Sequence, residues 1–295
     1  MIPMLTPWGP LCSAPRLVAE RENRVFEVLI EGIGRAALRL HRKGYQTAAA
    51  IEAELRWTQE LAARGFFCPS PFETLEGTLL GSVDGHVASL IRWIDAPEMA
   101  DVPVGLPHKL DRFEAVGRLL KQLHDLTALI DVSGYERPLW DHDGLLGEAP
   151  FWGRFWENPA LSHGEARDLQ RARDAAGEWL SAQTPGHLIH ADVLQENILL
   201  HEDGLCLIDY DDAGFGYPGY DLGTALIQSH DDVDLPQIAE ALCQGYEECT
   251  PEDALKFMAL RGFASCGWAV PRYSATAPEL RIYAERALSA ARPFL

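Results

Sequence analysis

The chain has 295 residues and a mass of 32.7 kDa, of which 47% are hydrophobic and 23% are charged. A chain of this length can bury a large core, and we expect it to form two lobes. Its apolar content excludes an intrinsically disordered chain. The net charge of −19 at pH 7 excludes bulk attraction to nucleic acid or to an anionic membrane, and indicates either simple solubility or the steering of a cationic substrate.

The six cysteines stand singly, without a CxxC pair, which argues against a zinc cluster or a disulfide scaffold. The segment MIPMLTPWGP lacks the basic region and apolar run of a signal peptide. No uninterrupted apolar run approaches the roughly 20 residues that a bilayer requires. We therefore expect a cytoplasmic protein with reduced thiols.

The first third of the chain predicts a sheet and one helix. Short apolar or alternating runs at 24–30 and 35–41 are separated by EGIG, which is typical of a hairpin. Helical spacing over 47–65 predicts a helix that stops at Gly65. The long apolar run at 86–94 predicts a central strand.

Residues 95–107 contain three prolines and no periodicity, so we place a lobe boundary there, with lobes at 1–95 and 96–295. From Lys109 the chain turns helical. Helices are expected at 109–129 and 164–183, and two or three more after Pro218. The expected fold class is α+β, with a small β-rich N-terminal lobe and a larger, mostly helical C-terminal lobe.

One stretch interrupts the helical lobe with polar residues between two short strands, NILL and LCLI. It contains His190-x-Asp192-x4-Asn197, followed by a strand that ends at Asp209. This spacing is typical of kinases, in which a carboxylate lies near the attacking hydroxyl and oxygen ligands hold Mg²⁺. The alternative is that Asp192 and Asn197 are ordinary turn residues. The correctly placed strands favour the functional interpretation, with His190 holding the loop by hydrogen bonds.

The segments LIHADVLQENILL and CLIDYDDAGFGYPGYDLGTAL resemble the catalytic loop, the metal-binding segment and the following helix of the aminoglycoside phosphotransferase/choline kinase superfamily. ERENRVFEV, AALRLHRKGY, IEAELRW and VGRLLKQLHDL resemble its phosphate-covering loop, cation-bearing strand, paired-glutamate helix and first large-lobe helix. The likeness spans most of Glu20 to Ile227. It implies a two-lobed, protein-kinase-like fold.

The resemblance also implies residue roles. Asp192 would be the catalytic base or would orient the hydroxyl, and Asn197 and Asp209 would hold Mg²⁺. Asp221 would brace the catalytic loop through its backbone amides, although its place at the start of a helix explains it equally. The cofactors would be ATP, with GTP left open, and Mg²⁺.

The chain departs from the family pattern on its cation-bearing strand, where Arg39 stands in place of the usual lysine. We expect Arg39 to contact phosphates and to pair with Glu54, because its guanidinium keeps the charge and adds a fork that grips oxygen pairs. The alternative places Arg39 on the exposed face of an edge strand and Glu54 on a solvent-facing side of its helix.

Other nucleotide contacts are expected from the backbone. No GxGxxG motif occurs, so amides around Asn23 would cover the phosphates, and the backbone from Arg92 to Ile94 would contact adenine. Position 194 is leucine, where protein kinases commonly carry lysine, which favours a small-molecule kinase.

The acceptor site is less defined. Asp211 and Asp212 are either solvated loop charges or ligands of a second metal or a cationic substrate. Trp152 and Trp156 lie among acidic residues and either embrace an amine or anchor the core. RGFASCGWAVPRYS lines a pocket or packs helices.

The sequence therefore predicts an ATP-dependent phosphotransferase that acts on a hydroxyl of a small molecule: an aminoglycoside or other aminocyclitol, a choline-like alcohol, homoserine or a sugar. One alternative is a protein Ser/Thr kinase of the stress-response type. The other is a nucleotide-binding pseudokinase, which the substitution at Arg39 keeps open and the intact Asp192, Asn197 and Asp209 argue against. The oligomeric state stays open.

Overall fold

The computed structural model describes residues 4–20 and 23–295. Residues 1–3, in the segment assessed for a signal peptide, and residues 21–22, in the expected phosphate-covering loop, lie outside the described residues. The chain forms two compact units. Unit 1 comprises Met1–Pro97, Leu129–Arg137 and Leu199–Asp211, and unit 2 comprises Glu98–Ala128, Pro138–Ile198 and Asp212–Leu295. The lobe boundary at residues 95 and 96 stays a prediction, and it does not describe the two later segments of unit 1.

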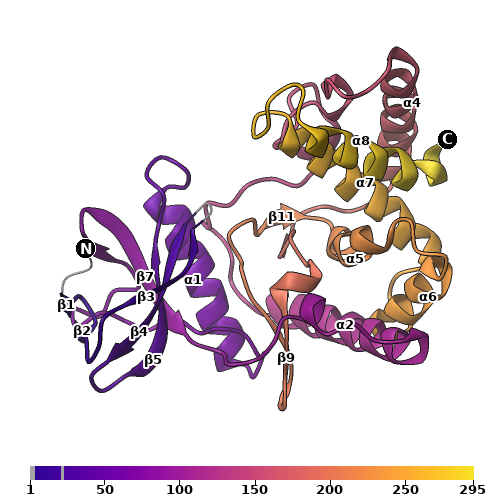
Figure 1. The fold of residues 1–295 in the computed structure, drawn as a ribbon. Coiled ribbons are helices and arrows are strands. Elements are labelled where there is room, and N and C mark those ends of the chain that lie inside the picture. The colour runs from indigo at the N-terminus through magenta and orange to yellow at the C-terminus, as the bar shows by residue number, and fades with distance from the viewer. Residues whose placement is uncertain (1–3, 21–22) are drawn as a thin grey trace. The chain divides into compact units, whose positions relative to one another are not determined.

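Unit 1 is built on a five-stranded antiparallel sheet in the order β3-β4-β5-β7-β6 (Figure 1). Its strands are β3 (Arg16–Glu20), β4 (Arg24–Ile30), β5 (Gly34–Leu40), β6 (Gly81–Val83) and β7 (His86–Arg92). A two-stranded sheet of β1 (Leu5–Thr6) and β2 (Gly9–Pro10) precedes it. The expected central strand is β7, which lies inside the sheet because it pairs with the middle strand β5 on one side and with the short β6, which the sequence analysis missed, on the other.

The predicted hairpin is confirmed as β4 and β5. Gly32 and Gly34 in its turn have φ of +80° and +91°, a region that residues with a Cβ rarely adopt. One face of the sheet buries Val28, Leu38 and Leu90 in a common apolar cluster. Burial of that cluster holds β5 in the centre of the sheet.

The predicted helix is α1 (Ala48–Ala63), which runs alongside the sheet (Figure 1). The Thr47 side chain caps it by accepting from the Ala50 N–H at 3.0 Å, and Gly65, with φ of +88°, follows its end as predicted. Ile51 and Leu55 form a buried cluster with Leu79, which fixes one face of the helix.

Unit 2 is mainly helical. Its helices are α2 (Leu106–Thr127), α3 (His142–Leu146), α4 (His163–Leu180), α5 (Pro218–Leu226), α6 (Leu235–Tyr246), α7 (Pro251–Ala269) and α8 (Pro278–Ala290). Its 3-10 turns are η1 (Met99–Asp101), η2 (Phe155–Glu157), η3 (Gln195–Asn197), η4 (Ile227–Ser229) and η5 (Arg292–Phe294). Four α-helices follow residue 217, whereas two or three were expected. Helix α7 contains a run of small and apolar residues that is buried on nearly every side, so this run shows no helical periodicity.

Helices α2 and α6 approach closely because each presents a glycine to the other. A Cβ at Gly117 would lie 2.1 Å from the Leu242 carbonyl oxygen, and one at Gly245 would lie 1.9 Å from that of Glu114. Only glycine permits this backbone contact, which holds α2 against α6.

The polar stretch contains four short strands. In unit 2, β8 (His187–Ile189) pairs antiparallel with β11 (Gly214–Gly216), a pairing that sequence analysis missed. The predicted strands NILL and LCLI are β9 (Ile198–His201) and β10 (Gly204–Leu207), which pair with each other. From Leu199 onward this hairpin belongs to unit 1.

Throughout residues 4–20 and 23–295, none of the helices combines the length and the apolar character that crossing a bilayer requires.

Candidate active site

Asp192 lies in the loop between β8 and η3, where hydrogen bonds hold its backbone and its carboxylate. Its N–H donates to His190 Nδ1 at 3.2 Å. The Asn197 amide donates from Nδ2 to the Asp192 carbonyl at 2.8 Å and to Oδ2 at 2.9 Å. Because the nitrogen of this amide faces Asp192, its oxygen is the atom left to act as a ligand.

Asp221, on α5, contacts the same loop from the buried side. Its fully buried carboxylate accepts the N–H groups of His190 at 2.9 Å and Ala191 at 2.6 Å. His124 Nε2 on α2 donates a third hydrogen bond at 3.0 Å. Ala191 has φ of +65°, which costs free energy in a residue with a Cβ, and the bond to Asp221 offsets that cost. Asp221 therefore braces the loop that carries Asp192, and the catalytic role of that loop stays a prediction.

Asp209 follows β10 in unit 1, with an exposed side chain and φ of +64°. Strained non-glycine backbone is concentrated at functional sites. The Asn197 amide oxygen and the Asp209 carboxylate are hard oxygen donors of the kind Mg²⁺ prefers, and Mg²⁺ is commonly held by one or two such groups together with phosphates. Among the described residues, no three or more His, Cys, Asp or Glu side chains gather as a metal cluster. Asn197 and Asp209 belong to different units, so their joint metal role stays a prediction.

Arg39 is buried on the central strand of the sheet, with 7% of its side chain exposed. The alternative interpretation, which placed Arg39 on the exposed face of an edge strand, is therefore wrong. Its Nη1 donates to Glu54 Oε1 on α1 at 2.6 Å, and its Nη2 donates to Asp211 Oδ1. Glu54 is likewise buried rather than facing solvent. Burial opposes the charge of Arg39, but the carboxylates of Asp211 and Glu54 outweigh it and raise the pKa of Arg39 above its ordinary value.

Asp211 is not a solvated loop charge. Besides Arg39, its carboxylate accepts from Asn23 Nδ2, and its carbonyl accepts from Gln46 Nε2 at 2.7 Å. Asn23 Oδ1 in turn accepts from the Arg42 N–H at 3.2 Å. Asn23, predicted to cover phosphates, is therefore tied to Asp211 and to the segment that follows β5, and its contact with phosphate stays a prediction.

Arg137 is a residue that sequence reasoning missed. Its guanidinium, 1% exposed, donates to the carbonyl oxygens of Ala50 at 3.0 Å, Tyr210 at 3.1 Å and Asp211 at 2.6 Å. It lies 4.0 Å from Glu54 Oε2. One side chain thus fastens α1 to the segment that follows Asp209.

Arg261, on α7, is a second missed residue. Its Nη2 donates to Asp192 Oδ1 at 2.6 Å, and its guanidinium lies 4.7 Å from the centre of the Trp152 ring. The signal available in the sequence was a lone arginine in the apolar run ALRGFASCGWA. Buried arginines need a partner, but the sequence does not say which one.

The residues predicted to contact the acceptor differ in their burial and in their contacts. Trp156 is 8% exposed and lies beneath the Arg173 guanidinium at 4.2 Å, which supports the core interpretation. Trp152 is partly exposed and contacts both Arg261 and the buried Trp140. The Asp212 side chain is partly exposed, and its carbonyl accepts from Trp140 Nε1 at 2.9 Å. Trp152 and Asp212 stay candidates for acceptor contact.

The expected adenine segment follows the end of β7. The Arg92 N–H donates to the Ser70 carbonyl at 2.9 Å, and the Arg92 side chain is exposed. Because that N–H is engaged, a backbone donor to adenine would come from a later residue such as Ile94. The adenine contact stays a prediction.

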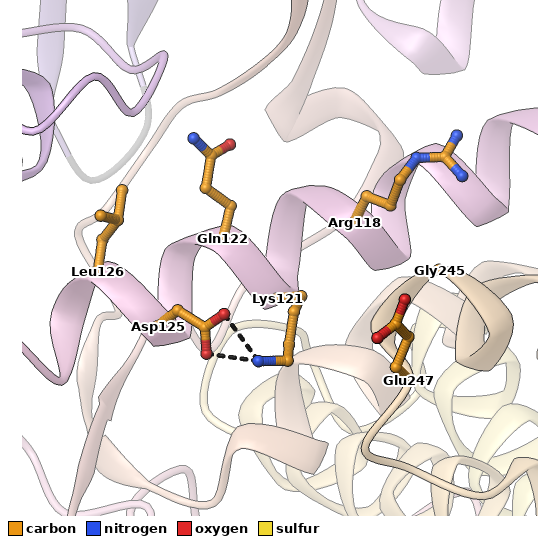
Figure 2. A pocket seen from close by; sticks show the side chains of 7 residues that line it. All are labelled: Arg118, Lys121, Gln122, Asp125, Leu126, Gly245 and Glu247. Atoms are coloured by element: carbon orange, nitrogen blue, oxygen red, sulfur yellow. Dashed lines mark hydrogen bonds and ion pairs between the residues drawn. The ribbon is translucent and has the colours of Figure 1, made fainter.

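A pocket of about 470 Å³ lies apart from the predicted residues, along α2 and the end of α6 (Figure 2). Its lining residues are Arg118, Lys121, Gln122, Asp125, Leu126, Gly245 and Glu247. Lys121 Nζ binds both carboxylate oxygens of Asp125, at 2.6 and 2.7 Å. This pairing of neighbouring charges gives no reason to assign the pocket a ligand.

The order of elements, with a β-sheet and α1 followed by a helical part that begins with a braced His-x-Asp loop, defines a protein-kinase-like phosphotransferase fold. Residues 14–259 match the model of the phosphotransferase enzyme family that includes aminoglycoside phosphotransferases. The chain belongs to this family. The predicted family and the predicted fold class are confirmed.

The similar proteins include kinases of small molecules. The homoserine kinase of Rhizobium etli is 31% identical over 179 residues, which cover 57% of this chain and 50% of that protein. The chain thus spans about half the length of that relative. The structure of a microcompartment-associated aminopropanol kinase has a TM-score of 0.79 at 26% identity, covering 96% of this chain and 90% of that one. An amicoumacin kinase in complex with AMP-PNP and Ca²⁺ has a TM-score of 0.72 at 16% identity, covering 93% and 87%, which shows the shared fold.

Proposed function

We propose that this chain transfers the γ-phosphoryl group of ATP to a hydroxyl of a small molecule. The observation that carries the proposal is the immobilised carboxylate of Asp192. Arg261 holds one of its oxygens and Asn197 the other, and Asp221 fixes the backbone of its loop. Phosphoryl transfer depends mainly on positioning and charge stabilisation, so a carboxylate fixed on both sides suits the role of orienting an attacking hydroxyl.

The remaining roles follow from the donor types. Asn197 and Asp209 would hold Mg²⁺, which neutralises charge on the phosphates when it is bound. Arg39, with Glu54 behind it, would steady the phosphates, and the backbone near Ile94 would contact the adenine. ATP is the proposed donor, and GTP is the alternative nucleotide.

The proposed acceptor is a small hydroxylated amine. The homoserine and aminopropanol kinases to which the chain is similar are named for small amino alcohols, which favours such an acceptor over a protein substrate. The net charge of −19 is compatible with the approach of a cation. Trp152 and Asp212 are the proposed contacts in unit 2.

The test is an ADP-release screen over hydroxylated amines, amino acids, choline-like alcohols, aminoglycosides and sugars. We expect turnover with at least one acceptor, loss of turnover on removal of Mg²⁺ with EDTA, and a fall in kcat on the order of 100-fold or more for Asp192→Asn. Asp143→Asn, at a carboxylate that is 91% exposed, is the matched control and should leave kcat unchanged. Full turnover by Asp192→Asn, with its melting temperature preserved, would contradict the assignment.

A further inference from the structure

The charged side chain of Arg261 lies in the long, largely buried helix α7 of unit 2. Residues 257–267 of α7 are all buried, and only 6% of the Arg261 side chain is exposed. Burying a guanidinium is costly unless it is paired with an opposite charge. Its partner is Asp192, 69 residues away in the sequence, so the ion pair joins α7 to the catalytic loop.

Each carboxylate oxygen of Asp192 accepts a hydrogen bond from a different side chain. Arg261 Nη2 donates to Asp192 Oδ1 at 2.6 Å, and Asn197 Nδ2 donates to Oδ2 at 2.9 Å. Hydrogen bonds to both oxygens restrict the rotation of the carboxylate about its side-chain bonds. The Trp152 ring lies against the Arg261 guanidinium, 4.7 Å from the ring centre, which limits the movement of the guanidinium.

The other nitrogens of Arg261 are withdrawn from solvent. Nε and Nη1 are both buried, as is the Tyr220 hydroxyl. An acceptor molecule therefore meets the carboxylate of Asp192, which is 17% exposed, while the guanidinium lies behind it. This arrangement suits a residue that acts through Asp192 better than one that binds the acceptor.

We propose that Arg261 is a positioning residue for phosphoryl transfer, which holds the Asp192 carboxylate in the orientation that accepts the hydrogen bond of the acceptor hydroxyl. The inference rests on the proposed function. It assigns a role to α7, which sequence analysis had associated only with pocket lining or helix packing. A positioning role predicts a loss in kcat, whereas contact with the acceptor predicts a loss in KM.

The first part of the test needs no acceptor. Melting temperatures are measured for the full chain, Arg261→Gln, Asp192→Asn and the double variant. Since each single variant leaves its buried partner unpaired, we expect the double variant to lose less than the sum of the single losses. If the losses in melting temperature were additive, Arg261 and Asp192 would not stabilise the fold as a pair.

The second part uses an acceptor from the screen. We expect kcat to fall on the order of 100-fold in Arg261→Gln, with both KM values within about 3-fold of wild type, and Arg261→Lys to restore part of kcat. Lys256→Gln, on the same helix with its ammonium 2.7 Å from Glu252, is the control. Unchanged kcat in both Arg261 variants, or a rise in the acceptor KM alone, would overturn the inference.

The two proposals fail differently. Absence of turnover by the wild-type chain with every acceptor counts against the proposed function and leaves the melting cycle to decide on the pair. Turnover that survives at full kcat without Arg261 counts against the positioning role and leaves the proposed function standing. Arg261→Lys keeps the charge, so it provides the kinetic comparison if Arg261→Gln does not fold.

Discussion

At the scale of single residues, Arg39 shows how an arginine can occupy a position where kinase-like folds usually place lysine. Its two terminal nitrogens hold two carboxylates at once, Glu54 and Asp211. A lysine ammonium is a single point of charge and cannot span both with the same geometry. The arginine and the aspartate two residues after Asp209 are therefore a matched pair.

We predict that Arg39→Met destabilises the fold by about 3–5 kcal/mol, because it leaves buried carboxylates unpaired. Arg39→Lys should lose less, since it keeps the charge, and should retain nucleotide binding better than Arg39→Met. Urea unfolding and calorimetric titration with ATP measure these two effects. Arg35→Lys, half exposed on the same strand, is the control, and equal stability of Arg39→Met and wild type would contradict the pairing.

The residues predicted from sequence and those missed differ in how far away their partners lie. The contact between Asp192 and Asn197 could be expected from sequence, because only five residues separate them and the spacing itself carries information. Arg261 was missed because its partner is 69 residues away, and Asp211 was misjudged because Arg39 is 172 residues away. Contacts between residues so far apart form only when the chain folds, so local sequence spacing does not predict them.

At the scale of elements, periodicity predicted most long helices and the β4–β5 hairpin, since one buried face leaves a regular pattern. The two- and three-residue strands were missed because they are too short to show alternation. The last part of α7 could not be assigned from sequence, because burial on nearly every side removes the helical pattern. Contacts between elements were not predicted, and Arg137 illustrates one, since it joins α1 to the carbonyls of Tyr210 and Asp211.

We predict that Arg137→Met lowers the free energy of unfolding by about 2–4 kcal/mol, because it leaves three buried or partly buried carbonyl acceptors without their charged donor. Chemical denaturation measures the loss. Arg56→Met, at an exposed arginine of α1 paired with Glu52, should change stability by less than about 1 kcal/mol. An equal effect of the two substitutions would show that Arg137 does not fasten these elements.

At the scale of the whole molecule, the stability of the fold depends on pH through buried groups that resist a change of charge. His41 is 5% exposed, with Nε2 2.9 Å from Ser89 Oγ. Burial, together with the charge of Arg39, lowers the pKa of His41 to about 3 from an ordinary value of 6.5. Below pH 6.5 the His41 imidazole therefore binds a proton in the unfolded chain but stays neutral in the folded chain until the pH approaches 3.

This contribution to stability is fully present above pH 6.5 and is lost as the pH falls toward 3. We predict that wild type loses about 2 kcal/mol more than His41→Gln between pH 7.5 and pH 5.0. Unfolding in urea at both pH values measures the difference. His163→Gln, at an exposed histidine, should follow wild type, and parallel losses in wild type and His41→Gln would contradict the assignment.

Arg39 also determines how the chain would respond to covalent chemistry. Acylating reagents delivered by a nucleotide label kinases through an amine at the phosphate site, and at the position we propose for phosphate contact β5 carries a guanidinium instead. The lysines of the chain are Lys43, Lys109, Lys121 and Lys256, all outside that strand. Profiling methods that detect kinases by their reactive amine would therefore pass over this protein, and a dicarbonyl reagent selective for guanidinium groups would be the appropriate probe.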